Sequence, residues 1–175
     1  SSILNAEHVI LPGVGAFGDA MKKLHSYGLV EVIREVAANR TPFLGICLGL
    51  QLMFESSEEA PGVEGLSLLK GRIVRLPDTE DLKIPHIGWN SLKYPNSGRL
   101  FAGIPEDSYV YFVHSYYLQA GEPEIVKAAT EYGTYIHASV EKGNLFACQF
   151  HPEKSSSVGL QILRNFAGIS GKGGM

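Results

Sequence analysis

The stretch Gly45-Ile46-Cys47-Leu48-Gly49 places one thiol between two glycines, where a strand pattern ends and a helix pattern begins. A reactive side chain at a sharp strand-to-helix turn is typical of a nucleophile elbow, in which the central residue is strained. The turn brings backbone segments close together, so side chains at 45 and 49 would collide. The helix that follows favours the thiolate, which is the nucleophilic form. A buried structural cysteine beside two turn glycines fits the same pattern, so the assignment depends on finding a base.

The best candidate for that base is His151, which follows a strand-like run over 145–150 and precedes Pro152 and Glu153. Catalytic groups gather at strand ends in open α/β sheets. Residues two apart in extended backbone face the same way, so Glu153 can lie beside the His151 ring. A carboxylate there would hold the imidazole tautomer and stabilise the imidazolium. The alternative is a chance His-Pro-Glu turn, but a cysteine elbow in the same chain favours the catalytic pair.

The other titratable residues of these types have weaker claims. Cys148 alternates with phenylalanines, so we expect a small buried residue without a catalytic role. We expect surface, packing or structural roles for His8, His25 and His137. His86 and His114 stand in unusual aromatic and glycine-containing settings.

The order of elements around these groups predicts an α/β fold. Apolar periodicity predicts helices over 17–26, 30–38 and 48–55, and a last helix capped by Ser155 or Ser156. Strand patterns cover 9–11, 42–46, 68–76, 84–94, 109–118, 125–131, 135–140 and 145–150, while 56–65 reads as an exposed loop. The βαβα order of the first half predicts a parallel sheet with right-handed crossovers. Glycines between the last three strands predict antiparallel hairpins.

Length and composition indicate one α/β domain over residues 1–175. The net charge is −3 without a basic block, which argues against nucleic acid as a partner. No apolar run approaches the roughly 20 residues of a membrane helix, and no signal peptide is visible. Two cysteines do not make a disulfide framework, so we expect a reducing, cytoplasmic setting.

Several motifs together resemble a known family. The pattern Gly-x-Cys-x-Gly-x-Gln over 45–51, with Phe-His-Pro-Glu over 150–153, is similar to that of the class I (triad) glutamine amidotransferases. Within that family, the motifs over 11–17, 85–90, 112–117 and 149–155 resemble those of the glutaminase subunits of imidazole glycerol phosphate synthase. The resemblance runs from about residue 8 to residue 166, and the combination of motifs in this order is specific.

The resemblance implies a three-layer, flavodoxin-like class I glutamine amidotransferase fold. Its central sheet would be mostly parallel, with a C-terminal antiparallel extension. The family normally begins with a further strand and a glycine-asparagine loop, which do not occur in this sequence. We therefore expect the N-terminal strand to be missing, which would leave strand edges and an apolar face without cover.

The resemblance also implies the roles of the site residues. Cys47 would attack the amide carbon of glutamine to form a γ-glutamyl thioester. His151 would act as general base and then as acid to the leaving ammonia, with Glu153 orienting it. The oxyanion would be bound by the N–H of Leu48 and by the Gly13-Val14 peptide after that peptide reorients, which glycine makes inexpensive.

Further roles concern substrate and partner. The implied glutamine site comprises Gln51, Gly49 and the backbone near Ser115 and Tyr116. The family works as a heterodimer with a (β/α)₈-barrel cyclase subunit that receives ammonia across the interface, and it uses no cofactor or metal. Possible partner contacts are His86, Trp89, Asn90 and Lys154. Core packing for Trp89 and a solvated charge for Lys154 remain open as alternatives.

Two other functions stay open on the sequence. One is a related enzyme on the same fold, either another class I amidotransferase or a γ-glutamyl hydrolase with water as acceptor. The other is a binding subunit or fragment that keeps the motifs without activity.

Overall fold

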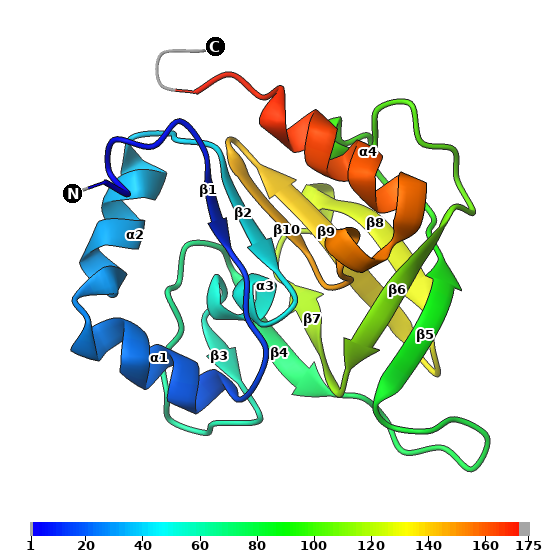
Figure 1. Cartoon of the computed structure of the whole chain (residues 1–175). Coiled ribbons are helices and arrows are strands. Elements are labelled where there is room, and N and C mark those ends of the chain that lie inside the picture. Colours follow the sequence, from blue (N-terminus) through cyan, green and yellow to red (C-terminus); the bar gives the residue numbers. More distant parts are fainter. Residues whose placement is uncertain (1, 172–175) are drawn as a thin grey trace.

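The computed structural model describes residues 2–171, and its centre is a five-stranded sheet (Figure 1). The strand order is β1 (Val9–Leu11), β2 (Phe43–Ile46), β10 (Leu145–Cys148), β9 (Tyr135–Lys142) and β8 (Val126–Glu131). The first three strands are parallel, whereas β9 and β8 pair antiparallel. The predicted fold class is therefore confirmed, with an antiparallel extension on one side. Among the described residues β1 pairs with β2 alone and is an edge strand.

Helices cover both faces of this sheet, giving three layers (Figure 1). Helices α1 (Phe17–Ser26) and α2 (Leu29–Ala38) pack on one face, and α4 (Ser156–Ala167) packs on the other. Strand β2 is buried along its whole length because its alternate residues face these two layers. No helix within residues 2–171 is long and apolar enough to cross a membrane.

Two smaller sheets complete the structure. Strands β3 (Ser56–Ser57), β4 (Gly71–Arg75) and β7 (Tyr116–Ala120) form one, and β5 (His86–Ser91) and β6 (Tyr109–His114) form the other. Short helices are α3 (Leu48–Leu52) and the 3₁₀ turns η1 (Arg99–Phe101), η2 (Pro123–Ile125) and η3 (Pro152–Lys154).

The prediction of one strand over 109–118 was wrong. The chain leaves the β5–β6 sheet at Ser115 and joins β4 as β7, so the two halves lie in different sheets. The Ser115 carbonyl accepts from the N–H of Leu76, which holds the crossing in place. Both halves carry aromatic residues, and no glycine or proline marks the break.

Two neighbouring predictions also need correction. The helix expected over 48–55 ends at Leu52, after five residues. The segment expected as an exposed loop begins with β3, which pairs parallel with β4 and buries Ser57. Backbone pairing rather than apolar pattern forms this strand, so its polar sequence did not reveal it.

The elbow glycines are required by close packing, as predicted. A Cβ at Gly49 would lie 1.8 Å from the Leu11 carbonyl oxygen, and one at Gly45 would lie 2.6 Å from Met53 Sδ. Neither distance is sterically possible, so the elbow and the end of β1 can approach only because residue 49 has no side chain.

We expect Gly49→Ala to lower the free energy of unfolding by about 3 kcal/mol or more, because the new methyl group meets rigid backbone. Denaturant unfolding followed by circular dichroism measures this change. Gly168→Ala is the matched control, because its Cβ would have contacts no shorter than 3.6 Å. Equal stability of the two variants would contradict the steric argument.

Candidate active site

A cleft of about 330 Å³ opens beside the elbow. It lies where the loop after β1, the elbow after β2 and the β6–β7 crossing meet. Its lining comprises Val14, Gly15, Cys47, Leu48, Gln51, Glu59, Pro85, Val113, His114, Ser115 and Tyr116. The cleft therefore brings together the predicted nucleophile and most of the predicted oxyanion and glutamine-binding residues.

Cys47 has the strained backbone of a nucleophile elbow, with φ 55° and ψ −110°. Its N–H donates to the Cys148 carbonyl at 2.8 Å, which ties the elbow to β10. Cys47 is 7% exposed, and its thiol lies 3.8 Å from the carbonyl oxygen of Val113, to which it donates. In this state the sulfur is anchored to β6.

The expectation that the resting site favours the thiolate was wrong. Burial raises the pKa of the Cys47 thiol to about 11. The N–H of Leu48 acts in the opposite direction, but the charge of Glu153 adds to the increase in pKa. Desolvation outweighs the contribution of the short helix α3, so Cys47 carries its proton until a base removes it.

His151 and Glu153 form the predicted pair. His151 Nδ1 lies 2.9 Å from Glu153 Oε2, and the imidazole is buried. A carboxylate only accepts, so Nδ1 carries a proton, and in the neutral ring Nε2 keeps a lone pair. Among residues 2–171, Nε2 is buried and has no hydrogen-bond partner. The site thus contains a base whose accepting atom is unoccupied, although Cys47 does not bond to it in this structure.

Ser155 fixes the turn that carries His151, a role missed from sequence. Its hydroxyl donates to the His151 carbonyl at 2.6 Å and accepts from the N–H of Tyr111 at 2.9 Å. Ser155 occupies the N-cap position of α4, but its side chain makes no capping bond to that helix. The expected cap instead joins the turn that carries His151 to β6.

The expected oxyanion site is closed. The N–H of Leu48, the first expected donor, already donates to the Gly13 carbonyl at 3.2 Å. Rotation of the Gly13-Val14 peptide would withdraw that oxygen and turn the N–H of Val14 toward the site. Gly15 has φ 109° with open space around it, and Val14 is 77% exposed, so the surroundings allow such a rotation.

A buried amide network links the cleft wall to the nucleophile. Gln51 Nε2 donates to the Tyr116 carbonyl and to Gln149 Oε1, both at 3.1 Å. Gln149 Nε2 lies 3.7 Å from Cys47 Sγ. Gln149 stood in a recognised motif, but sequence reasoning gave it no role. Gly49, expected to bind substrate, does not line the cleft and instead packs against β1.

Glu59 is a second residue that sequence reasoning missed. Its carboxylate lines the cleft, and its Oε1 accepts from the N–H of Phe17 at 2.9 Å. It lies in a stretch with several acidic residues that read as a solvated loop, so no signal set it apart.

Within residues 2–171, no group of three or more His, Cys, Asp or Glu side chains could hold a metal ion.

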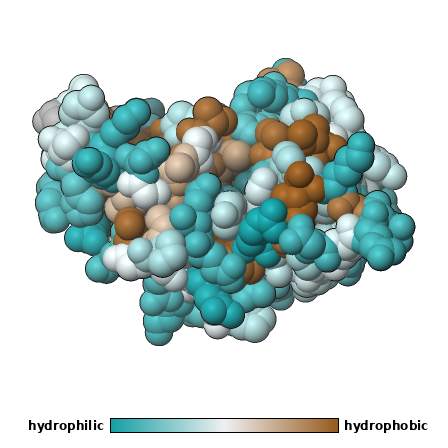
Figure 2. All heavy atoms as spheres, turned by 90° about the horizontal axis from the view of Figure 1, so that it is seen from below, coloured by the Kyte–Doolittle hydropathy of each residue, from teal (hydrophilic) through white to brown (hydrophobic). Residues whose placement is uncertain are grey.

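The possible partner contacts separate by exposure. Trp89 is 51% exposed on the outer side of β5, so core packing does not explain it, and Lys154 is also exposed. Asn90 is half-buried. His86 is 2% exposed, which corrects its expected direct contact with a partner. Seen from below, hydrophobic atoms reach the surface at several places between polar ones (Figure 2).

Comparison with known proteins assigns the chain to a family. The family model of the class I glutamine amidotransferases matches residues 3–168, so the chain belongs to this family. It is 56% identical over 164 residues to the imidazole glycerol phosphate synthase subunit HisH of Moorella thermoacetica, covering 94% of this chain and 77% of that protein. The protein of the same name from Methanocaldococcus jannaschii is 49% identical, covering 94% and 81%.

Solved structures agree at the level of fold. PurLQS from Thermotoga maritima matches with a TM-score of 0.67 at 21% identity, covering 92% of this chain and 78% of that chain. A likeness at this identity concerns the fold alone.

We expect alkylation of Cys47 by iodoacetamide to accelerate about tenfold per pH unit until about pH 11, because only the thiolate reacts and burial raises its pKa. Mass spectrometry of the free chain at increasing pH gives the rate, provided that the chain remains folded. The Cys47→Ala variant reports any labelling of Cys148. A plateau near the pKa of an unperturbed thiol, about 8.5, would contradict the effect of burial.

Proposed function

We propose that this chain hydrolyses glutamine to glutamate and ammonia, as the glutaminase subunit of an imidazole glycerol phosphate synthase. The observation that carries this proposal is the arrangement of three residues. Cys47 lies in the cleft on the elbow after β2, and the bonded pair His151 and Glu153 follows β10, the neighbouring parallel strand. The relatives named as HisH subunits support the pathway, which is histidine biosynthesis. The ammonia would pass to a (β/α)₈-barrel cyclase subunit in a heterodimer.

The chemistry follows from the properties of each group. Cys47 Sγ attacks the carboxamide carbon, and its proton moves to the unoccupied Nε2 of His151. The imidazolium, stabilised by Glu153, returns the proton to the leaving ammonia, which leaves a γ-glutamyl thioester. Water then attacks the thioester with His151 as base, and glutamate leaves.

Three features of the resting site explain why such a subunit would be slow alone. The thiol is protonated, its sulfur is held at the Val113 carbonyl, and the Gly13 carbonyl occupies the oxyanion donor of Leu48. One oxyanion donor is worth roughly 10²–10³ in rate, so rotation of the Gly13-Val14 peptide alone would produce a large activation.

The cleft also suggests how glutamine is oriented. Glu59 provides a carboxylate for the α-ammonium group of the substrate, and the backbone at Ser115 and Tyr116 provides polar groups on the opposite wall. Gln51 holds the Tyr116 carbonyl in place from behind. Gln51 therefore shapes the glutamine site through backbone and need not touch the substrate.

The outer side of the β5–β6 sheet is the proposed docking surface for the cyclase. Its exposed side chains include Ile87, Trp89 and Tyr109, which are 59%, 51% and 58% exposed. Exposed aromatic and aliphatic side chains close together mark interaction surfaces. Lys154, beside His151 and exposed, would contact the partner near the catalytic turn. A covered cleft would keep ammonia from being protonated in water.

The decisive test measures glutamine hydrolysis by the chain alone and with a barrel cyclase carrying its nucleotide ligand. We expect a low rate alone and roughly 10²-fold or greater activation in the complex, because the oxyanion site must open. Cys47→Ala should bind the partner without hydrolysing glutamine. Equal rates with and without the cyclase would indicate a free-standing hydrolase, and no hydrolysis in either would indicate a binding subunit without activity.

His151→Ala should slow glutamine hydrolysis by roughly 10³-fold or more, because it removes the proposed general base for the Cys47 thiol. Glu153→Gln should cost less, roughly 10–10²-fold, since the ring keeps a partner at Nδ1 and Glu153 is half exposed. The kcat values of both variants in the complex provide the comparison. Equal losses would show that Glu153 does more than orient the ring.

A further inference from the structure

Two buried histidines connect strand β5 to the cleft wall. His86 Nδ1 lies 3.0 Å from His114 Nε2, and His114 Nδ1 lies 2.9 Å from the Tyr116 carbonyl oxygen. That carbonyl also accepts from Gln51. His114 and Tyr116 both line the cleft, whereas His86 lies behind them. The mechanism above assigns neither histidine a role.

The direction of each hydrogen bond from Asn90 through the two histidines to Tyr116 can be deduced. The Tyr116 carbonyl only accepts, so His114 carries its proton on Nδ1 and accepts at Nε2. His86 must then donate from Nδ1, which leaves its Nε2 as an acceptor for Asn90 Nδ2 at 3.4 Å. All donors point toward the cleft, and the arrangement requires both rings to be neutral.

Packing and burial keep the two rings in this form. His86 stacks between Phe112, with centroids 4.7 Å apart, and Tyr132, with centroids 3.9 Å apart. Burial, with the nearby His114, lowers the pKa of His86 to about 3. Burial lowers the pKa of His114 to about 4.

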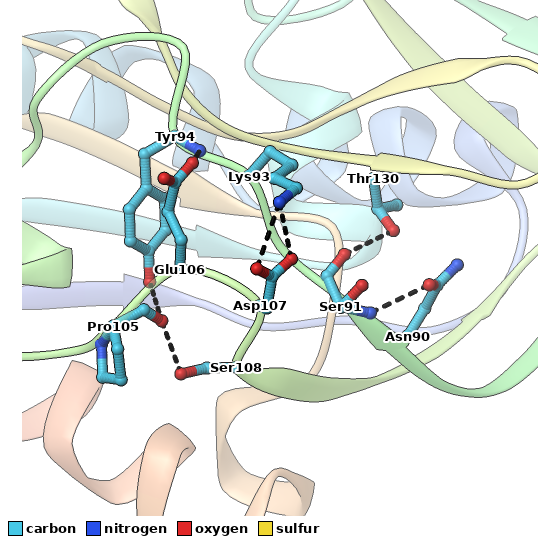
Figure 3. A network of polar contacts seen from close by, with 9 residues as sticks. All are labelled: Asn90, Ser91, Lys93, Tyr94, Pro105, Glu106, Asp107, Ser108 and Thr130. Carbon is cyan, nitrogen blue, oxygen red and sulfur yellow. Dashed lines mark hydrogen bonds and ion pairs between the residues drawn. The ribbon is translucent and has the colours of Figure 1, made fainter.

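Asn90, at the other end of this series of hydrogen bonds, is fixed as well. Asn90 Nδ2 donates to the Glu131 carbonyl at 2.9 Å, and Asn90 Oδ1 accepts from the N–H of Ser91. Thr130 donates to the carbonyl of Ser91, which attaches this end of β5 to β8 (Figure 3). The amide orientation of Asn90 is therefore set by backbone groups, and the second N–H of its Nδ2 faces His86.

We propose that His86 and His114 are positioning residues for glutamine. As a neutral, hydrogen-bonded pair they hold the Tyr116 carbonyl, and with it the Ser115–Tyr116 wall of the cleft, in register with β5. The inference rests on the proposed function and adds a coupling between the docking surface and the cleft. The outer side of β5 carries Trp89, so the His86–His114 pair transmits movement of this strand to the Ser115–Tyr116 wall. Loss of the His86 donor leaves His114 Nε2 buried without a partner and loosens the wall.

Two substitutions at His86 separate hydrogen bonding from packing. His86→Phe keeps a ring between Phe112 and Tyr132 but removes the donor. His86→Asn loses the ring but places an amide N–H near the position of Nδ1. Glutamine binding is measured by calorimetry in the Cys47→Ala background, in complex with the cyclase, so that no turnover occurs.

We expect His86→Phe to weaken glutamine binding roughly tenfold, and His86→Asn to restore it to within about threefold. A purely packing role predicts the reverse order, which would overturn the proposal. In the enzyme with Cys47 intact, the same variants should change KM for glutamine more than kcat. His8→Phe is the matched control: it removes a histidine bond to the Ile169 carbonyl, neither residue lines the cleft, and binding should not change.

The tautomers are tested independently of glutamine. Long-range ¹⁵N–¹H spectra of the full chain should show both rings neutral with the proton on Nδ1, and a proton on Nε2 of His114 would overturn the proposal. If the spectra show the expected tautomers but the Cys47→Ala parent does not bind glutamine, both the proposed function and the positioning role are refuted. Parent binding that His86→Phe leaves unchanged would refute the positioning role alone.

Discussion

The structure depends on the contact between the backbone of Gly49 and the carbonyl of Leu11. No side chain fits at residue 49, so the end of β1 can lie directly against the elbow. This approach places the loop after β1 within reach of Leu48, whose N–H donates to the Gly13 carbonyl. The same packing leaves Cys47 with a strained backbone and little solvent, which raises its pKa. The tight packing of the elbow against β1 therefore also accounts for the low reactivity of the Cys47 thiol.

The low reactivity of the resting site can be reversed by small local changes. A peptide between glycines rotates at low cost, and a thiol held by a weak bond to a carbonyl is easily released. The base needs no rearrangement, since Glu153 already sets its tautomer and Ser155 clamps its turn. Under the proposed mechanism, the resting site thus has its base in place and lacks only the oxyanion donor and the thiolate.

The sequence predicted much of this arrangement and missed particular parts for physical reasons. The elbow, the His151–Glu153 pair and the α/β order have strong local signals, because glycine spacing and apolar periodicity depend on neighbouring residues. The break at Ser115 had no such signal, since aromatic residues continue on both sides of it. Glu59, Gln149 and the clamp at Ser155 depend on residues distant in sequence, and the pKa of Cys47 depends on burial, which local pattern does not report.

The crossing at Ser115 has a mechanical consequence. One residue separates β6 from β7, whereas ten residues join β4 to β5, so the shortest covalent link between the two small sheets lies in the cleft wall. A change of angle between these sheets must be absorbed on that side by the torsions of this residue. The backbone torsions of Ser115 therefore contribute both to the angle between the two sheets and to the shape of the cleft wall in which this residue lies.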